Sequence, residues 1–224
     1  LNFAKTLGVE KFVLLSAICV QKPMLAFQNA KVAFEKELIK SGLNYSIVRP
    51  TAFFKSLAGQ VKRVKSNQRF IVFDNGEKTA CKPISEFDLA KYICDCLRVS
   101  DRANQILPIG GPGPAITPKQ QGELLFKIAK KREKFRSVPS SMFSLIGALM
   151  KPISLVSEKV SDLEEFTRIG HYYATESMLV WDPISKNYSS ELTPEFGEDT
   201  LEEFYDRVLL QGIKGHELRA HKLF

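Results

Sequence analysis

Two side chains of this sequence, Ser16 and Lys31, have the types and the spacing expected of a ligand-binding pair. Ser16 lies near the end of the apolar run Phe12 to Ala17, and Lys31 lies one helical turn after Phe27, on the same helix face. An ammonium group on that face donates hydrogen bonds and favours a negatively charged ligand. The pair therefore predicts a polar binding site where a strand meets the following helix.

The elements that must position this pair form a strand, a helix and a second strand. Phe12 to Ala17 has the continuous apolar character of a buried strand, and Met24 to Ser41 repeats apolar residues at spacings of three and four. Tyr45 to Val48 is the next buried strand. A crossover helix makes these strands parallel, and ligands collect at the carboxyl ends of parallel strands. Those ends carry Ser16 and the segment Arg49-Pro50-Thr51.

Each candidate also has a simpler interpretation. A serine at a strand end is commonly a turn residue, and Lys31 can be an exposed helical lysine that pairs with Glu35 at i+4. We favour the binding role because Ser16, Lys31 and Arg49-Pro50 are expected at one edge of the same sheet.

The rest of the chain continues the α/β alternation up to about residue 134. Arg69 to Phe73 and Gln105 to Ile109 are expected strands, and Ile84 to Val99 is an expected helix with Ser85 as its N-cap. Thr117 and Pro118 open another helix, which runs through Lys130. From residue 135 to 224 we expect a mostly helical cap that includes the apolar stretch Met142 to Val156.

The composition argues against several classes of protein. The formal net charge is +7, but basic and acidic residues are interleaved without a basic stripe carrying aromatic residues, so we expect no nucleic-acid partner. The four cysteines are expected to be buried thiols, and the three scattered histidines predict no metal site. The sequence contains no apolar run of about 18 residues, so no transmembrane segment is expected.

The glycine-rich loop Gly110-Gly111-Pro112-Gly113 is not expected to bind phosphate, because Pro112 and Pro114 remove backbone donors. The sequence also lacks the G-x-G-x-x-G pattern that seats a dinucleotide pyrophosphate in the first βα turn of such sheets. We therefore expect that turn to lie upstream of Leu1, and that the isolated chain is inactive.

Ser16 and the helix from Phe27 to Lys31 resemble the Ser and Tyr-x-x-x-Lys set of short-chain dehydrogenases. In that set, the lysine holds the nicotinamide ribose and lowers the pKa of the tyrosine. Phe27 occupies the tyrosine position here, and a phenyl ring cannot transfer a proton. The usual interconversion of carbonyl and alcohol is therefore not expected.

Six segments resemble the family of NADPH-dependent divinyl chlorophyllide a 8-vinyl-reductases of plants, algae and some phototrophic bacteria. The phenylalanine in place of tyrosine and the IGGPG loop are not general dehydrogenase features, which makes the resemblance specific. The segments run from one end of the chain to the other: Lys11 to Pro23, Phe27 to Lys31, Tyr45 to Leu57, Cys81 to Glu86, Leu107 to Gly113, and Gly170 to Leu179.

The resemblance implies the C-terminal half of an NAD(P)-binding Rossmann-like domain at residues 1–134 and a substrate-side cap at 135–224. It implies reduction of the 8-vinyl group of divinyl chlorophyllide or protochlorophyllide to ethyl by hydride from NADPH, in chlorophyll biosynthesis. A chloroplast location would follow in a eukaryote and a cytoplasmic one in a bacterium, with peripheral membrane association allowed.

The resemblance also implies roles for individual residues. Ser16 and Lys31 would be catalytic and would position the cofactor, with the segment after the second strand running alongside the nicotinamide. Aromatic side chains and the Met142 to Val156 stretch would cover the tetrapyrrole, and two tyrosines are candidate proton donors. The cofactor-binding residues of that segment are Arg49, Pro50 and Thr51, and the substrate-binding candidates are Phe53, Phe54, Tyr172 and Tyr173.

Two rival functions remain open at the level of sequence. The first is a non-catalytic NAD(P)-binding sensor or assembly protein, which the missing tyrosine favours and the specific family segments disfavour. The second is a reductase of another unsaturated substrate, such as a phenylpropanoid, in which the IGGPG loop is not expected. Conversion of pigment with NADPH separates the first rival from the reductase.

A parallel sheet without its first strands exposes apolar edges, so we predict that the isolated 224-residue chain aggregates or is poorly soluble. Size-exclusion chromatography and backbone NMR of the purified chain test this prediction. A monomer with well-dispersed resonances would contradict it.

Overall fold

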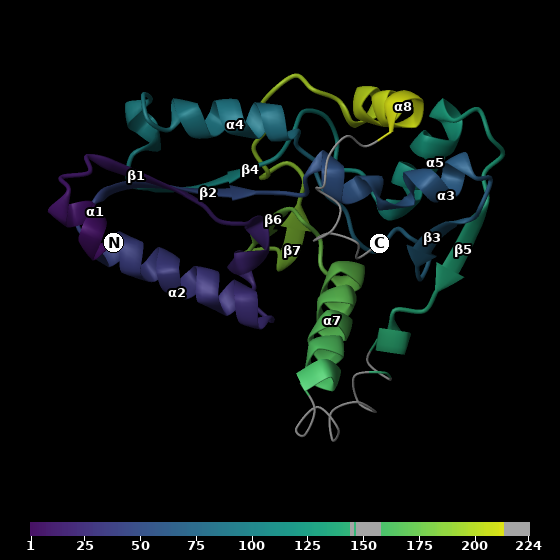
Figure 1. Cartoon of the computed structure of the whole chain (residues 1–224), viewed down its shortest axis with the longest axis horizontal. Coiled ribbons are helices and arrows are strands. Elements are labelled where there is room, and N and C mark those ends of the chain that lie inside the picture. Colours follow the sequence, from purple (N-terminus) through teal and green to yellow (C-terminus); the bar gives the residue numbers. More distant parts are fainter. Residues whose placement is uncertain (144–145, 147–157, 213–224) are drawn as a thin grey trace. The chain divides into compact units, whose positions relative to one another are not determined.

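The computed structural model describes residues 1–143, 146 and 158–212 (Figure 1). The chain forms two compact units that are interleaved in sequence. The predicted boundary between residues 134 and 135 does not coincide with these units and stays a prediction about domains. The first unit contains Leu1–Phe54, Cys81–Ala115 and Met178–Leu201, and the second contains Lys55–Ala80, Ile116–Ser177 and Glu202–Phe224.

The first unit is built on a parallel sheet in the order β1-β2-β4, formed by Lys11–Leu15, Asn44–Pro50 and Gln105–Ile109. Leu15 pairs with Val48, and Pro50 pairs with Ile109, so the carboxyl ends of the strands lie at one edge. The predicted Rossmann-like parallel sheet is therefore confirmed as a partial sheet. β1 follows the short helix α1 (Asn2–Thr6), and Gly8, at φ +65°, lies just after the end of that helix.

Helices α2 (Ala26–Lys40) and α4 (Glu86–Asp95) cover opposite faces of this sheet (Figure 1). The Asp88 N–H donates to Ser85 Oγ at 2.9 Å, which confirms the predicted N-cap of α4. Beneath α4 lies an apolar core, in which burial stabilises the fold by roughly 1.5–3 kcal/mol for each large side chain. The buried members of this core are Val48, Ile84, Leu89, Tyr92, Cys96 and Ile109.

Two short strands near the carboxyl end of the chain return to the first unit. β6 (Val180–Asp182) and β7 (Asn187–Ser189) form an antiparallel hairpin. The sequence pattern did not predict it, because three residues are too few to establish an alternating pattern. The Gln21 side chain fixes the hairpin beside the 3-10 helix η1 (Ile18–Gln21), since its Nε2 donates to Leu179 O at 2.6 Å and its Oε1 accepts from Trp181 N at 2.8 Å.

The second unit contains a two-stranded parallel sheet, formed by β3 (Phe70–Phe73) and β5 (Phe135–Val138). The sequence predicted the first of these strands but not the second. Thr117 and Pro118 open α5 (Pro118–Ile128), as expected from the sequence, and Gln120 completes a capping box with Thr117 that was not predicted. Residues 144, 145 and 147–156 of the predicted apolar stretch lie outside the described residues. The elements of this unit are η2 (Phe54–Gln60), α3 (Val61–Lys65), β3 (Phe70–Phe73), α5 (Pro118–Ile128), β5 (Phe135–Val138), α7 (Glu158–Thr175) and α8 (Leu201–Gln211).

Gly111 lies where the chain after β4 passes another backbone segment without space for a side chain. A Cβ atom on Gly111 would stand 2.1 Å from Pro83 O. We predict that Gly111→Ala destabilises the full-length protein by more than about 3 kcal/mol, because the obstructing atom belongs to the backbone and cannot rotate away. Denaturant unfolding measures this effect.

The matched control is Gly42→Ala. Gly42 has φ +75° with nothing within 4 Å of the added Cβ, so the change costs only the backbone strain of about 1 kcal/mol. Equal losses of unfolding free energy in the two variants would show that the close approach at Gly111 does not contribute to stability.

Candidate functional site

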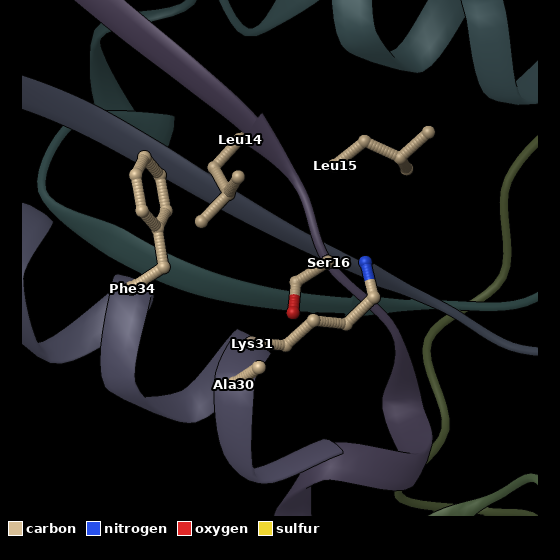
Figure 2. A pocket seen from close by; sticks show the side chains of 6 residues that line it. All are labelled: Leu14, Leu15, Ser16, Ala30, Lys31 and Phe34. Atoms are coloured by element: carbon tan, nitrogen blue, oxygen red, sulfur yellow. The ribbon is translucent and has the colours of Figure 1, made fainter. Parts of the chain in front are cut away.

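Ser16 and Lys31 line the same pocket, as the sequence predicted (Figure 2). Ser16 directly follows β1, and Lys31 extends from the second turn of α2 along the serine side chain. The pocket has a volume of about 310 Å³ and mostly apolar walls, with one hydroxyl and one ammonium group as its polar side chains. The remaining lining residues are Leu14, Leu15, Ala30 and Phe34.

Ser16 carries a buried hydroxyl group without a hydrogen-bond partner in the described part of the chain. Its backbone N–H donates to Val48 O at 2.8 Å, which continues the pairing of β1 with β2. Its side chain is buried, and among the described residues Ser16 Oγ has no hydrogen-bond partner. An unsatisfied buried hydroxyl is costly, typically by about 1–3 kcal/mol. The site therefore fits a polar ligand group, such as the sugar hydroxyl of a dinucleotide.

The first turn of α2 is fixed by a side chain from the helix itself. Gln28 Oε1 accepts hydrogen bonds from Met24 N at 2.7 Å and from Leu25 N at 3.0 Å. These bonds satisfy backbone donors at a helix start whose N-cap residue, Leu25, has no polar side chain. The turn that leads to Lys31 is thus held in place.

An ion pair joins α2 to β2. Arg49 Nε donates to Glu35 Oε1 at 3.1 Å, and Arg49 Nη2 donates to Glu35 Oε2. The Glu35 side chain is 3% exposed, and the bidentate geometry orients both groups. The alternative interpretation in which Lys31 pairs with Glu35 is therefore wrong, because Glu35 binds Arg49 instead. The guanidinium of Arg49 has a structural partner, and its predicted contact with a cofactor stays a prediction.

Pro50 and Thr51 lie at the carboxyl end of β2, next to β4. Thr51 N donates to Ile109 O at 2.9 Å, and Thr51 Oγ1 donates to Lys82 O. The hydroxyl proton of Thr51 is thus committed within the protein, which leaves its oxygen as an acceptor. Thr51 itself is buried. Sequence reasoning missed Lys82, although it lies within the Cys81 to Glu86 segment of the family resemblance.

Cys19 is the thiol closest in sequence to this site. Burial raises the pKa of Cys19, while a hydrogen bond with Gln28 and the positive charges of Lys31 and Arg49 act in the opposite direction. A raised pKa keeps the group in its neutral thiol form at neutral pH. Cys19 therefore packs as a small buried side chain in its thiol form.

The predicted substrate-binding residues differ in exposure. Phe53 forms a β-bridge with Ile84 and is partly exposed, whereas Phe54 is 2% exposed. Tyr172 and Tyr173 lie on α7 in the second unit, with ring centroids 5.6 Å apart in an edge-on arrangement. Tyr172 is buried and Tyr173 is partly exposed. Their contact with a substrate stays a prediction.

Two further properties bear on the class of site. Within residues 1–143, 146 and 158–212, His, Cys, Asp and Glu side chains form no cluster suited to a metal ion. None of the helices described over these ranges combines the length and apolar character needed to cross a membrane.

Comparisons with known proteins agree with a dinucleotide site. A family model described as NAD(P)H-binding matches residues 1–99. The chain is 50% identical over 229 aligned positions to the chloroplastic divinyl chlorophyllide a 8-vinyl-reductase of Oryza sativa subsp. indica, covering 100% of this chain and 56% of the relative. It is 50% identical over 220 positions to the Arabidopsis thaliana enzyme of the same name, covering 96% of this chain and 53% of the relative. The chain thus spans about half the length of these relatives.

The fold is also similar to solved structures. The NADPH-dependent quinone oxidoreductase from Escherichia coli, complexed with NADPH, matches with a TM-score of 0.63 and 17% identity, covering 92% of this chain and 68% of that chain. At this identity the similarity shows the fold alone.

The ion pair between α2 and β2 leads to a direct test. We predict that Glu35→Gln destabilises the full-length protein by about 3 kcal/mol, because it leaves the largely buried Arg49 guanidinium without a counter-charge. Amide hydrogen exchange in α2 should accelerate more than in α4. Denaturant unfolding and hydrogen exchange measure the two effects.

The control is Glu37→Gln on the same helix. Glu37 forms an exposed pair with Lys40, at 67% and 74% side-chain exposure, so the change should cost less than about 0.5 kcal/mol. If the two variants lose the same unfolding free energy, the Arg49–Glu35 pair does not anchor α2.

Proposed function

We propose that this chain, which is about 50% identical to plant divinyl chlorophyllide a 8-vinyl-reductases, forms part of an NADPH-dependent reductase of this kind. The proposed reaction converts the 8-vinyl group of divinyl chlorophyllide or protochlorophyllide to ethyl, in chlorophyll biosynthesis. The observation that carries the proposal is the shared pocket of Ser16 and Lys31, in which a buried hydroxyl with no partner among the residues that the structure describes lies beside an ammonium group. That pair suits the ribose end of a dinucleotide.

The proposed chemistry explains why a phenylalanine is tolerated at position 27. NADPH, when bound beside Ser16 and Lys31, would supply the hydride for one carbon of the vinyl double bond, and a proton would be needed at the other. This reaction forms no alkoxide, so the protein needs no tyrosine hydroxyl at that point. Phe27 is partly buried on α2 and contributes an apolar surface instead.

In this proposal, Lys31 donates hydrogen bonds to the ribose hydroxyls, and its positive charge favours the negatively charged cofactor. Ser16 Oγ supplies the second polar contact, and because it has no partner among the described residues, it can both donate and accept. Arg49 acts by holding α2 through Glu35, which keeps Lys31 next to Ser16. Pro50 and Thr51 complete the edge of the sheet beside the nicotinamide.

The substrate side of the proposal rests on the aromatic residues. In the first unit Phe53 is partly exposed and Phe54 is buried, and in the second unit Tyr173 is partly exposed and Tyr172 is buried. Each of the two partly exposed rings is a candidate for contact with a flat tetrapyrrole. A tyrosine hydroxyl is the proposed proton donor. A chloroplast location in a photosynthetic eukaryote, with peripheral membrane association, would give access to this apolar pigment.

One observation favours a second function, an NAD(P)-binding assembly or sensor protein without catalysis. Phe27 removes the proton-transfer group that short-chain dehydrogenases use. Such a protein would bind NADPH and leave divinyl pigment unchanged, so pigment analysis by chromatography after incubation with NADPH distinguishes the two functions.

We predict that Lys31→Ala in the full-length protein lowers kcat/KM for conversion of 8-vinyl to 8-ethyl pigment by about 100-fold, through loss of charged hydrogen bonds to the cofactor. The dissociation constant of NADPH, measured by fluorescence titration, should rise in parallel. Unchanged turnover would remove Lys31 from the mechanism.

Lys36→Ala is the matched control for this variant. Lys36 is exposed on the same helix and does not line the pocket, so its removal changes the helix charge equally without touching the site. We expect it to retain pigment turnover and NADPH affinity.

A further inference from the structure

We propose that Lys82 is a positioning residue for the dinucleotide site, and that its ion pair with Glu195 fixes the loops at the carboxyl ends of β2 and β4. The inference rests on the proposed function, since it assigns a role at the same edge of the sheet that carries Ser16. Neither Lys82 nor Glu195 lines the Ser16–Lys31 pocket, so both act through other residues.

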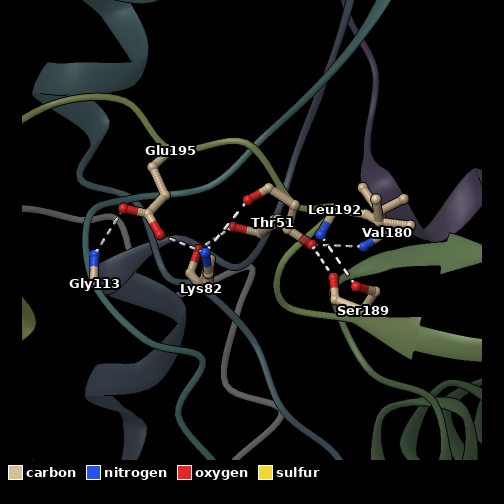
Figure 3. A network of polar contacts seen from close by, with 8 residues as sticks. Thr51, Lys82, Gly113, Val180, Ser189, Leu192 and Glu195 are labelled. Atoms are coloured by element: carbon tan, nitrogen blue, oxygen red, sulfur yellow. Dashed lines mark hydrogen bonds and ion pairs between the residues drawn. The ribbon is translucent and has the colours of Figure 1, made fainter.

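Lys82 is a buried lysine whose ammonium group is held by one short segment of chain (Figure 3). Its side chain is 7% exposed, its Nζ bonds to Glu195 Oε1, and it approaches Thr193 O at 3.4 Å. Burying an ammonium group is costly unless it is paired and hydrogen-bonded. The position of residues 193–195 is therefore tied to that of Lys82.

The backbone of Lys82 binds the ends of both strands at the same time. Its carbonyl oxygen accepts from Thr51 Oγ1, directly after β2, and from Gly111 N at 3.2 Å, just after β4. A Cβ atom on Gly110 would stand 2.8 Å from Lys82 Cβ, so the glycine allows this close approach. One residue thus connects the ends of two neighbouring strands.

The segment around Glu195 extends the sheet beyond β4. Gly110 N donates to Pro194 O at 2.8 Å, and Phe196 N donates to Gly110 O at 2.9 Å. Gly110 and Glu195 form a parallel β-bridge. Residues 194–196 therefore lie alongside the chain just after β4, joined to it by an isolated β-bridge, and the Lys82 ammonium binds the Glu195 side chain.

Glu195 links the ion pair to the glycine-rich loop. Its Oε2 accepts from Gly113 N at 3.2 Å, while Oε1 binds Lys82. The hydrogen bond from Lys82 and the one from Gly113 hold the pKa of Glu195 below its usual value, so the carboxylate stays charged at neutral pH. The backbone donors of this loop at Gly110, Gly111 and Gly113 are thereby all occupied within the protein.

The location argues for more than a contribution to stability. A buried lysine–glutamate pair is often no more stabilising than apolar residues of the same volume, whereas its geometry is specific. This pair fixes the chain that surrounds Thr51, at the strand edge where parallel sheets bind ligands. A displacement of that edge would disturb the cofactor contact at Thr51 without removing any group that touches the cofactor at Ser16 or Lys31.

The test uses the full-length protein with Lys82→Met, which keeps the length of the side chain, and Glu195→Gln, which keeps its shape. We expect each variant to raise the NADPH dissociation constant and the KM for NADPH by about tenfold, with a smaller change in kcat at saturating NADPH. Lys82→Arg, which keeps the charge, should restore affinity to within about threefold of the unchanged protein.

The matched control is Lys119→Met, which removes a lysine from the exposed pair with Glu77 in the second unit. We expect it to leave NADPH affinity unchanged. If Lys82→Met and Glu195→Gln lower the melting temperature but leave the affinity and KM for NADPH unchanged, the pair only stabilises the fold and the proposal is overturned. If Lys82→Met does not fold, Glu195→Gln decides, because the Glu195 side chain is 46% exposed and glutamine keeps a side-chain oxygen that can accept from the Lys82 ammonium.

Failure of this inference and failure of the proposed function give different results. An unchanged protein that binds NADPH and converts no pigment contradicts the reductase function, while direct titration of NADPH still tests the role of Lys82. If the protein without substitutions converts pigment and the Lys82→Met variant binds NADPH with the same affinity, only the positioning role is contradicted.

Discussion

The two hydrogen bonds between the Arg49 guanidinium and the Glu35 carboxylate set the position of α2 on the sheet. Arg49 belongs to β2, which is paired with β1, and β1 leads directly into Ser16. Glu35 lies one helical turn after Lys31. A charge-assisted contact therefore links the helix that carries Lys31 to the strand next to β1, which ends at Ser16.

The polar contacts at the carboxyl edge of the sheet use backbone groups as much as side chains. Lys82 O receives Thr51 Oγ1 and Gly111 N, and the Lys82 ammonium binds the segment that returns to the sheet near the end of the chain. The glycine-rich loop thus serves close packing, and its backbone donors at Gly110, Gly111 and Gly113 bind groups within the protein. Gly197, at φ +97°, permits a second such approach, in which Asp88 accepts from Glu198 N at 3.1 Å and from Asp199 N at 3.0 Å.

The sequence predicted correctly those elements whose pattern is local. The continuous apolar runs at β1 and β2, the helical spacing along α2, and the cap residues Ser85 and Thr117 all correspond to observed elements. It failed where the signal is short or distant. The hairpin β6–β7 has strands of three residues, and the pairing of β3 with β5 joins segments separated by some sixty residues of chain. Neither feature leaves a periodic trace in the sequence.

Residue types alone determined that this chain contains a βαβ unit with a serine at a strand end, a lysine on the next helix and no tyrosine between them. These features follow from hydrophobic periodicity and from the chemistry of single side chains, which are local properties. Only the tertiary structure decided which charges meet. Glu35 forms an ion pair with Arg49 rather than with Lys31, and Lys82 forms an ion pair with a glutamate that lies 113 positions away in sequence. Such pairings depend on how distant segments come together, because a charge in an unfolded chain has no preferred partner, and the packed sheet gives it one.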